Sequence, residues 1–336
     1  MMRFGIFSVV DHYPAELRRS AGEFYAELLE QVEAAEELGY DSFWIAEHHF
    51  HEYGAIPSPP VWMAAAAGRT RRIRLGVAVS VLPFRNPLLV AEEYAMVDVL
   101  SGGRLNFGAG SGYLKHEFEG FGVSPEEKRE RFDEALAIIR KAWTGERFSH
   151  DGRFHRVRDV AIQVTPVQRP HPPIWVAILR NEAAPFVAKN GYPLMMIPYA
   201  TTEQLDELAR TVSAFKAAYR EAGHGDPETL ALAFGLHAYV AENFAEATAQ
   251  AREAMDRYVR TRLYAKQRPY GALVEKSLIA YGSPEEVIRV FRRYEACGFT
   301  LALPILNFGG LPQKLVLRSM ERLAREVLPA FASEGG

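Results

Sequence analysis

The chain has 336 residues, of which 48% are apolar and 24% charged, as in ordinary globular proteins. Its net charge of −3 argues against nucleic acid or an anionic membrane as the main partner, because both attract concentrated positive charge. A single cysteine excludes an internal disulfide and a cysteine-rich zinc cluster, and it fits the reducing cytoplasm. Asp11 and Pro14 break the first apolar run, so we expect neither a signal peptide nor a membrane span there.

Short apolar runs alternate with stretches of helical period along the chain. After the first run, Phe24, Leu28 and Val32 recur four residues apart and Gly39 supplies a C-terminal stop, which predicts a helix. The same pattern predicts strands at residues 4–10, 41–46, 73–82, 105–109, 174–178, 194–197, 230–240 and 299–306. Helices are expected at 24–38, 60–68, 88–100, 124–143, 182–190, 205–222, 245–262, from 283, and at 315–331. About eight strand–helix units favour an α/β fold, a closed (β/α)8 TIM barrel, over an open doubly wound sheet.

Two stretches interrupt this alternation. Residues 147–173 predict a hairpin around Asp151-Gly152 and then a proline-rich approach to the next strand. We interpret them as an insertion between the fourth and fifth units, so that residues 1–336 form one domain. Residues 264–277 are polar and contain glycine and proline, and we expect them to form a mobile lid over the pocket.

The active site of such a barrel lies at the carboxyl ends of its strands. The second predicted strand is followed by EHHFHE at 47–52, the densest cluster of titratable groups in the chain. Strand residues alternate in direction, so His48 and His49 cannot both face the mouth. A metal site is one interpretation, but only His237 offers a further imidazole near a strand end, and we expect no metal.

The third and fourth predicted strands end in small residues, which allow a flat ring to approach the backbone closely. GAGSG at 108–112 has the wrong spacing for a dinucleotide fingerprint, although its N–H groups and Ser111 suit an anion. A tight turn without a ligand is the alternative interpretation of this segment.

Several motifs together resemble the bacterial luciferase-like flavin monooxygenases. They are MRFGIF, GYDSFWIAEHHFHEYG, GVAVSVLPFRNPLLVAEEYAMVDVLSGGRLNFGAGSGY, PVQRPHPPIWVA, GYPLMM and SPEEVIRVFRRYEACGFTLALPIL, and they cover nearly the whole chain. The resemblance implies a TIM barrel that takes reduced FMN as co-substrate from a separate flavin reductase. It also implies activation of O2 as a flavin C4a-hydroperoxide, oxygenation of a small organic substrate, and a homodimer.

The resemblance assigns roles to particular residues. His48 matches the catalytic histidine, and Ala78-Val79 matches a non-prolyl cis peptide under the flavin ring. Luciferase proper has an arginine preceded by a reactive cysteine where this chain has Gly110-Ser111, so light emission and a long-chain aldehyde substrate are not expected. Arg180 is then expected to contact the phosphate instead. The full set of expected cofactor-binding residues is Ala78, Val79, Gly110, Ser111, Ile178, Arg180 and Asn181.

The expected substrate pocket is apolar or aromatic, which suits a largely apolar organic molecule. Its expected lining residues are Phe7, Phe50, Tyr113, Met195, Tyr199 and Phe308. Three alternatives remain at this point: a deazaflavin (F420)-dependent hydride-transfer oxidoreductase, a non-catalytic flavin-binding protein, and a metal-dependent hydrolase. The EHHF run favours the monooxygenase. Cys297 is expected to be a packing residue.

Overall fold

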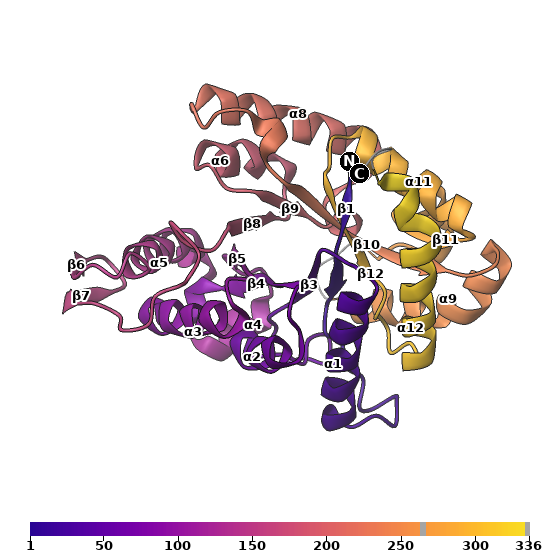
Figure 1. Ribbon diagram of the computed structural model, residues 1–336, viewed down its shortest axis with the longest axis horizontal. Helices are drawn as coiled ribbons and strands as arrows, with labels where there is room; N and C mark the ends of the chain where they lie inside the picture. Colours follow the sequence, from indigo (N-terminus) through magenta and orange to yellow (C-terminus); the bar gives the residue numbers. More distant parts are fainter. Residues whose placement is uncertain (263–266, 333–336) are drawn as a thin grey trace.

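The strands pair into one parallel sheet that closes into a barrel (Figure 1). The structure is a computed structural model and describes residues 1–262 and 267–332. The first predicted strand is split at Gly5 into β1, which pairs with β12, and β2, which pairs with β3. This split joins the two edges of the sheet and confirms the predicted TIM barrel. The barrel strands are β1 (Arg3–Phe4), β2 (Ile6–Ser8), β3 (Ser42–Ile45), β4 (Arg74–Val81), β5 (Leu105–Gly110), β8 (Ile174–Ile178), β9 (Leu194–Met196), β10 (Leu232–Val240), β11 (Ile279–Gly282) and β12 (Leu301–Ile305).

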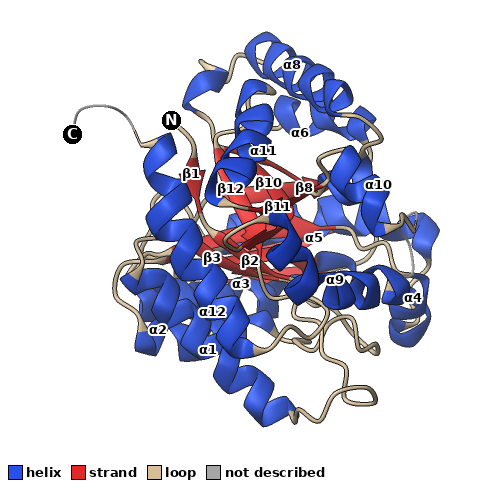
Figure 2. Cartoon of the chain, turned by 90° about the vertical axis from the view of Figure 1, so that its right-hand side faces the viewer, coloured by secondary structure: helices blue, strands red, loops and turns tan. Residues whose placement is uncertain are grey.

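Helices surround the sheet on its outer side (Figure 2). Two of them, α1 and α11, begin with complete capping boxes, built by Ser20 with Glu23 and by Ser283 with Glu286. The helices are α1 (Ala21–Glu37), α2 (Pro59–Arg69), α3 (Pro87–Ser101), α4 (Lys115–Phe121), α5 (Lys128–Ala142), α6 (Ala184–Lys189), α7 (Pro198–Thr201), α8 (Leu205–Glu221), α9 (Phe244–Thr261), α10 (Tyr270–Glu275), α11 (Pro284–Ala296) and α12 (Gln313–Arg322). No helix in the described ranges is both long and apolar enough to cross a membrane.

The predicted hairpin is present as the antiparallel pair β6 (Phe148–Asp151) and β7 (Arg156–Val160). The Glu134 carboxylate of α5 holds its tip by accepting hydrogen bonds from the backbone N–H groups of Phe154, at 3.2 Å, and His155, at 2.7 Å. The hairpin is therefore attached to the helix before it.

The region after α9 differs from the sequence-based expectation. Residues 270–275 form helix α10, with Tyr270 and Leu273 buried, and β11 is an additional strand that pairs with β10. Arg268 is also buried, and its guanidinium donates to the backbone oxygen of Thr202 at 3.0 Å. The proposed lid remains a prediction, and its residues 264–266 lie outside the described residues.

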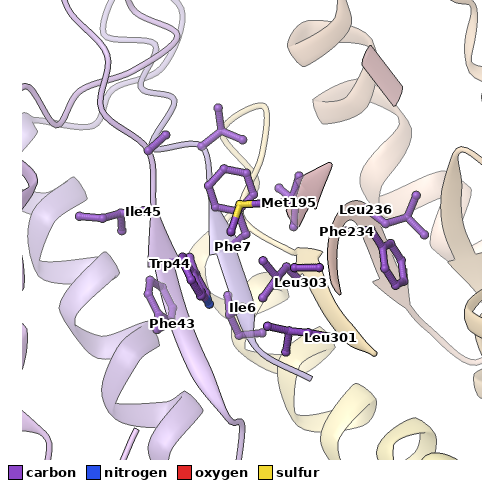
Figure 3. Packing of buried hydrophobic residues seen from close by; sticks show 14 of the residues in the cluster. Ile6, Phe7, Phe43, Trp44, Ile45, Met195, Phe234, Leu236, Leu301 and Leu303 are labelled. Atoms are coloured by element: carbon purple, nitrogen blue, oxygen red, sulfur yellow. The ribbon is translucent and has the colours of Figure 1, made fainter. Parts of the chain in front are cut away.

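Side chains from opposite strands fill the barrel interior (Figure 3). Phe7 of β2 lies beside Met195 of β9. The Trp44 indole of β3 crosses the position of Gly76 on β4. Gly76 permits that crossing, because a Cβ atom at Gly76 would lie 2.1 Å from the Trp44 ring. The barrel interior below the carboxyl ends of the strands is thus a packed core. A ligand can therefore bind only at the mouth.

Arg104, the last residue of the LSGGR motif, ties together the amino-terminal side of the barrel. It is buried, and its guanidinium donates to the backbone oxygens of Ser101 and Ile73, both at 2.7 Å, and of Thr70, at 3.1 Å. One side chain therefore joins the ends of α2 and α3 to the starts of β4 and β5.

Replacing Arg104 with Met should lower the free energy of unfolding by about 3 kcal/mol or more, because several buried carbonyl groups lose their donors. Urea denaturation followed by circular dichroism measures this change. The exposed neighbour Arg72 offers a matched control, and Arg72→Met should change the free energy by less than about 0.5 kcal/mol. Equal losses in the two variants would contradict the anchoring role of Arg104.

Candidate active site

A cavity of about 1020 Å³ opens at the carboxyl ends of the barrel strands. A smaller hollow of about 380 Å³ lies over the start of α1, where its arginine and glutamate side chains include the Arg19–Glu27 ion pair at 2.8 Å. We therefore place the site in the larger cavity. The predicted site residues that line it are Phe7, His48, Ala78, Val79, Gly110, Ser111, Tyr113, Ile178 and Arg180.

His48 lies in the segment after β3 and is held by a glutamate that the sequence analysis missed. The distance from His48 Nδ1 to Glu117 Oε1 is 3.1 Å, and the same oxygen accepts the backbone N–H of His49 at 2.9 Å. The His49 ring does not line the cavity; its Nε2 lies 3.3 Å from Glu47 Oε1 and its ring packs against Phe121. The expectation that only one histidine of the pair faces the mouth is confirmed.

Burial lowers the pKa of His48 below its ordinary value, and the positive charge of Arg262 acts in the same direction. Glu117 opposes this shift, because its hydrogen bond and negative charge favour the imidazolium ion. At neutral pH the imidazole is therefore uncharged. Since Glu117 is an acceptor, we assign the proton to Nδ1, which leaves the lone pair on Nε2.

The neighbouring strands β4 and β5 contribute Ala78, Val79 and Gly110 to the floor of the cavity. The Ala78–Val79 peptide bond is cis, as the family resemblance implied. A Cβ atom at Gly110 would lie 2.2 Å from Val79 Cγ2, so this position has no room for a side chain unless Val79 moves. The glycine therefore leaves room for the Val79 side chain.

The cavity rim carries more positive charge than expected. Besides Arg180, three basic residues of α5 line it: Lys128, Arg129 and Arg140. The Arg129 guanidinium lies over the Phe186 ring at 3.6 Å and bonds to Asp133 at 2.9 Å. Cations in the first turn of a helix are unfavourable because they oppose the helix dipole. The pair Lys128-Arg129 at the start of α5 was therefore a signal of a functional role in the sequence, and we overlooked it.

The closed end of the cavity contains two residues that the sequence did not reveal, Tyr53 and Arg262. The Tyr53 hydroxyl lies 2.5 Å from the hydroxyl of Tyr113. Arg262 caps the C-terminus of α9 and is only 5% exposed, and its guanidinium carbon lies 4.2 Å from the ring centres of both Tyr53 and Tyr258.

Five expected site residues lie outside this lining. The backbone of Phe50 has a φ of 60°, and its ring is 64% exposed beside Phe121. Met195 belongs to the packed interior, while Tyr199 and Phe308 are buried against the His237 ring. An aromatic side chain near a strand end can thus fill the core and not the pocket. The fifth is Asn181, which begins the turn after Arg180 and whose buried Oδ1 has no hydrogen-bond partner in the described part of the chain.

Within residues 1–262 and 267–332, no group of three or more His, Cys, Asp or Glu side chains is placed to hold a metal ion. The side chains of the EHHFHE run instead make separate contacts. Glu47, for example, also accepts a hydrogen bond from the Ser80 hydroxyl at 3.2 Å. Cys297 is half-buried, and its thiol lies 3.7 Å from the Leu205 backbone oxygen.

Fold and site together define a parallel α/β barrel with a neutral imidazole in an open, basic-rimmed cavity at its strand ends. The model of the luciferase-like monooxygenase family matches residues 2–301, and the chain belongs to that family.

Similar proteins include monooxygenases and F420-dependent enzymes. The oxygenase component of flavin-dependent trigonelline monooxygenase from Acinetobacter baylyi is 26% identical, over 98% of this chain and 96% of its own. F420-dependent glucose-6-phosphate dehydrogenase from Amycolatopsis mediterranei is 35% identical over 48% of this chain and 49% of its own. The crystal structure of monooxygenase RslO1 from Streptomyces bottropensis superposes with a TM-score of 0.91 and 33% identity, over 98% of this chain and 100% of RslO1.

Two proteins of Sinorhizobium fredii, y4vJ and y4wF, are 40% and 39% identical to this chain. The match covers 50% and 56% of this chain. It spans about half the length of these two relatives, 48% and 54%.

Replacing Glu117 with Gln should lower the pKa of His48 further, because the carboxylate charge that stabilises the imidazolium ion is removed while a hydrogen-bond acceptor remains. NMR titration of the His48 ring measures both values. In the unmodified protein the value should lie below the ordinary 6.5 or so of a free histidine. A His48 pKa that rises in the variant would contradict the assigned contact.

Proposed function

We propose that this protein is a flavin-dependent monooxygenase that uses reduced FMN and O2 to oxygenate a small, largely apolar organic substrate. The observation that carries this proposal is the uncharged His48 imidazole, held by Glu117 in the wall of a large cavity. Family membership and the named activities of the trigonelline monooxygenase component and RslO1 support it.

The residues of the cavity fit a flavin mononucleotide. Ala78 and Gly110 offer a floor without bulky side chains, which suits a flat ring. At the rim, Arg180 and Lys128 suit a phosphate group. We infer that these residues hold the cofactor, together with Val79, Ser111 and Ile178.

Reduced FMN, when bound, supplies the electrons that activate dioxygen. The protein's part is then to place a proton acceptor and donor and to limit access of water. With Nδ1 bonded to Glu117, His48 presents Nε2 as a hydrogen-bond acceptor and general base. Val9, Ile197 and Ile305 line the cavity with apolar surface, which favours an apolar substrate over water.

An F420-dependent hydride transfer is the second candidate. Lys128 and Arg140 of α5 add positive charge to that of Arg180, and a longer anionic cofactor tail would use it, whereas Arg129 is paired with Asp133. The F420-dependent relative matches about half of this chain. Spectroscopic titration with reduced FMN and with reduced F420 distinguishes the two, and tight binding of F420 alone would overturn the first proposal.

Replacing His48 with Gln should reduce oxygenation by about a hundredfold or more, because general acid–base catalysis typically contributes that much. The measurement is substrate-dependent consumption of O2 with reduced FMN, against a panel of aldehydes, ketones and amines. FMN binding, followed by fluorescence, should remain within a few-fold of the unmodified protein.

His116 supplies the matched control, because it lies on α4 beside Glu117 but contacts the His49 backbone oxygen, at 3.0 Å, outside the cavity lining. His116→Asn should retain oxygenation. Full oxygenation in His48→Gln would remove the catalytic role from His48.

We further propose that the protein is a cytoplasmic homodimer supplied with reduced flavin by a separate reductase. The trigonelline relative is named as an oxygenase component, which supports a two-component system. Neighbouring helices α2 and α3 expose large apolar side chains: Val61 is 71% exposed, Leu89 54%, Met96 52% and Leu100 57%. Leu89, Met96 and Leu100 follow helical spacing, so they form one stripe that a second copy would cover.

Replacing Met96 with Glu should convert the dimer to a monomer, because a charge would be buried in the apolar contact. Sedimentation velocity measures the mass of each form. Val164, 40% exposed but outside the stripe, gives the control Val164→Glu, which should stay dimeric. A monomeric unmodified protein would overturn the proposed assembly.

A further inference from the structure

Helix α4 holds the segment after β3 (residues 46–54) through the backbone of one residue. Glu117 accepts the N–H of His49 at 2.9 Å, and the neighbouring His116 bonds through Nε2 to the backbone oxygen of the same residue at 3.0 Å. This Nε2 must carry a proton, because a carbonyl oxygen can only accept. The contact between His48 and Glu117 thus belongs to an interface in which α4 binds both polar groups of the His49 backbone.

A further histidine of the segment faces the same interface. The centre of the His51 ring lies 5.6 Å from that of the His116 ring. Its Nδ1 accepts the backbone N–H of Tyr53 at 3.2 Å, so this nitrogen must carry no proton. The Tyr53 ring in turn packs 4.4 Å from the ring of His48. The observed arrangement therefore requires an uncharged His51, whereas His116 keeps its hydrogen bond in either charge state.

The surroundings of His51 disfavour its charged form. Burial lowers the pKa of His51 below its ordinary value, and the positive charge that His116 can carry acts in the same direction, while Glu52 opposes the shift. From the segment after β2, His12 contacts Glu52 through its backbone N–H, at 2.7 Å, and turns its own ring onto Phe24. Two charged imidazoles at the observed separation would repel each other across the interface.

Neighbouring charges of the packed helices are engaged with one another. On α4, Lys115 forms an ion pair with Glu119 at 3.3 Å. From α9, Arg260 acts on Glu52 but is itself bonded to Glu16 at 2.8 Å. In the described part of the chain, Glu52 is thus the carboxylate whose charge acts on the His51 ring.

We propose that His51 and His116 form a pH-sensitive contact, which keeps α4 on the segment after β3 while His51 is uncharged and releases it when both rings are protonated. On release, repulsion displaces His116 from the His49 oxygen, and Glu117, on the same turn of helix, is displaced with it. The contact controls the position of α4 and takes no part in the reaction, so this inference goes beyond the proposed function.

The direction of the pH dependence follows from linkage. A histidine that is held neutral in the closed form and can protonate in the open form favours opening as the pH falls below about 6.5, the ordinary pKa of the side chain. At pH 5.5 one such histidine favours the open form by about tenfold. Protonation of His48 acts in the opposite direction, because an imidazolium ion binds the Glu117 carboxylate more strongly. Opening at acid pH would therefore not come from His48.

Hydrogen exchange of the His49 amide, measured by NMR on the full chain, tests the proposal, because this N–H donates to Glu117. In the unmodified protein its protection, corrected for the intrinsic effect of pH, should fall by about tenfold between pH 7.5 and pH 5.5. The Leu75 amide bonds to the Arg104 oxygen, at 2.9 Å, at the other end of the barrel. It should stay the better protected of the two at both pH values, since the opening is local.

Two variants keep the hydrogen bonds and remove the charge. His51→Asn retains an acceptor in the place of Nδ1, and its loss of protection should shrink to less than about twofold. His116→Gln retains a donor in the place of Nε2 and should reduce the loss without abolishing it. His224 gives the matched control, because its Nε2 bonds to the Lys189 backbone oxygen at 2.9 Å, away from α4. His224→Gln should therefore lose protection as the unmodified protein does.

An undiminished loss of protection in His51→Asn would overturn the proposal, as would constant protection of the unmodified protein or equal protection of the two amides. If His51→Asn does not fold, as judged by circular dichroism, His116→Gln decides the question, and a loss equal to that of the unmodified protein overturns the proposal. These measurements involve no turnover. A protein that opens at acid pH but does not oxygenate would retain the pH-sensitive contact and overturn only the proposed function.

Discussion

Glu117 binds two successive residues of the segment after β3, the ring of His48 and the backbone N–H of His49. A buried carboxylate is tolerated only when its oxygens are satisfied, so this contact fixes helix α4 to that segment. It also determines which nitrogen of His48 carries the proton. The short helix, the direction of the imidazole and its protonation state thus depend on one side chain.

The cavity has a different electrostatic character at each end. Its rim is accessible and carries cations of α5 together with Arg180, while its closed end has a single guanidinium packed between tyrosine rings. Charges at an open rim attract anions over a distance, whereas a buried charge acts mainly on the groups packed around it. His48 lines the same cavity, and its ring lies 4.4 Å from that of Tyr53.

The barrel could be predicted from the sequence because buried parallel strands appear as apolar runs. The EHHF segment could be predicted to belong to the site because its titratable groups are contiguous. Glu117 was missed because α4 is too short to show a helical period. Arg262 was missed because periodicity in α9 does not reveal which end of the barrel the helix approaches. Phe50 was wrongly placed because its left-handed backbone, unusual for phenylalanine, reverses the direction expected of it.

The hydrogen bonds of Arg104 lie at the amino-terminal ends of β4 and β5, on the opposite side of the barrel from the cavity. Stability and chemistry are therefore placed in separate layers of the same strands. Mutations that reshape the mouth need not disturb the hydrogen bonds of Arg104 at the other end of the barrel. The fold can therefore accept changes in its ligand site without losing stability. A family built this way can diversify its ligands while its framework is retained.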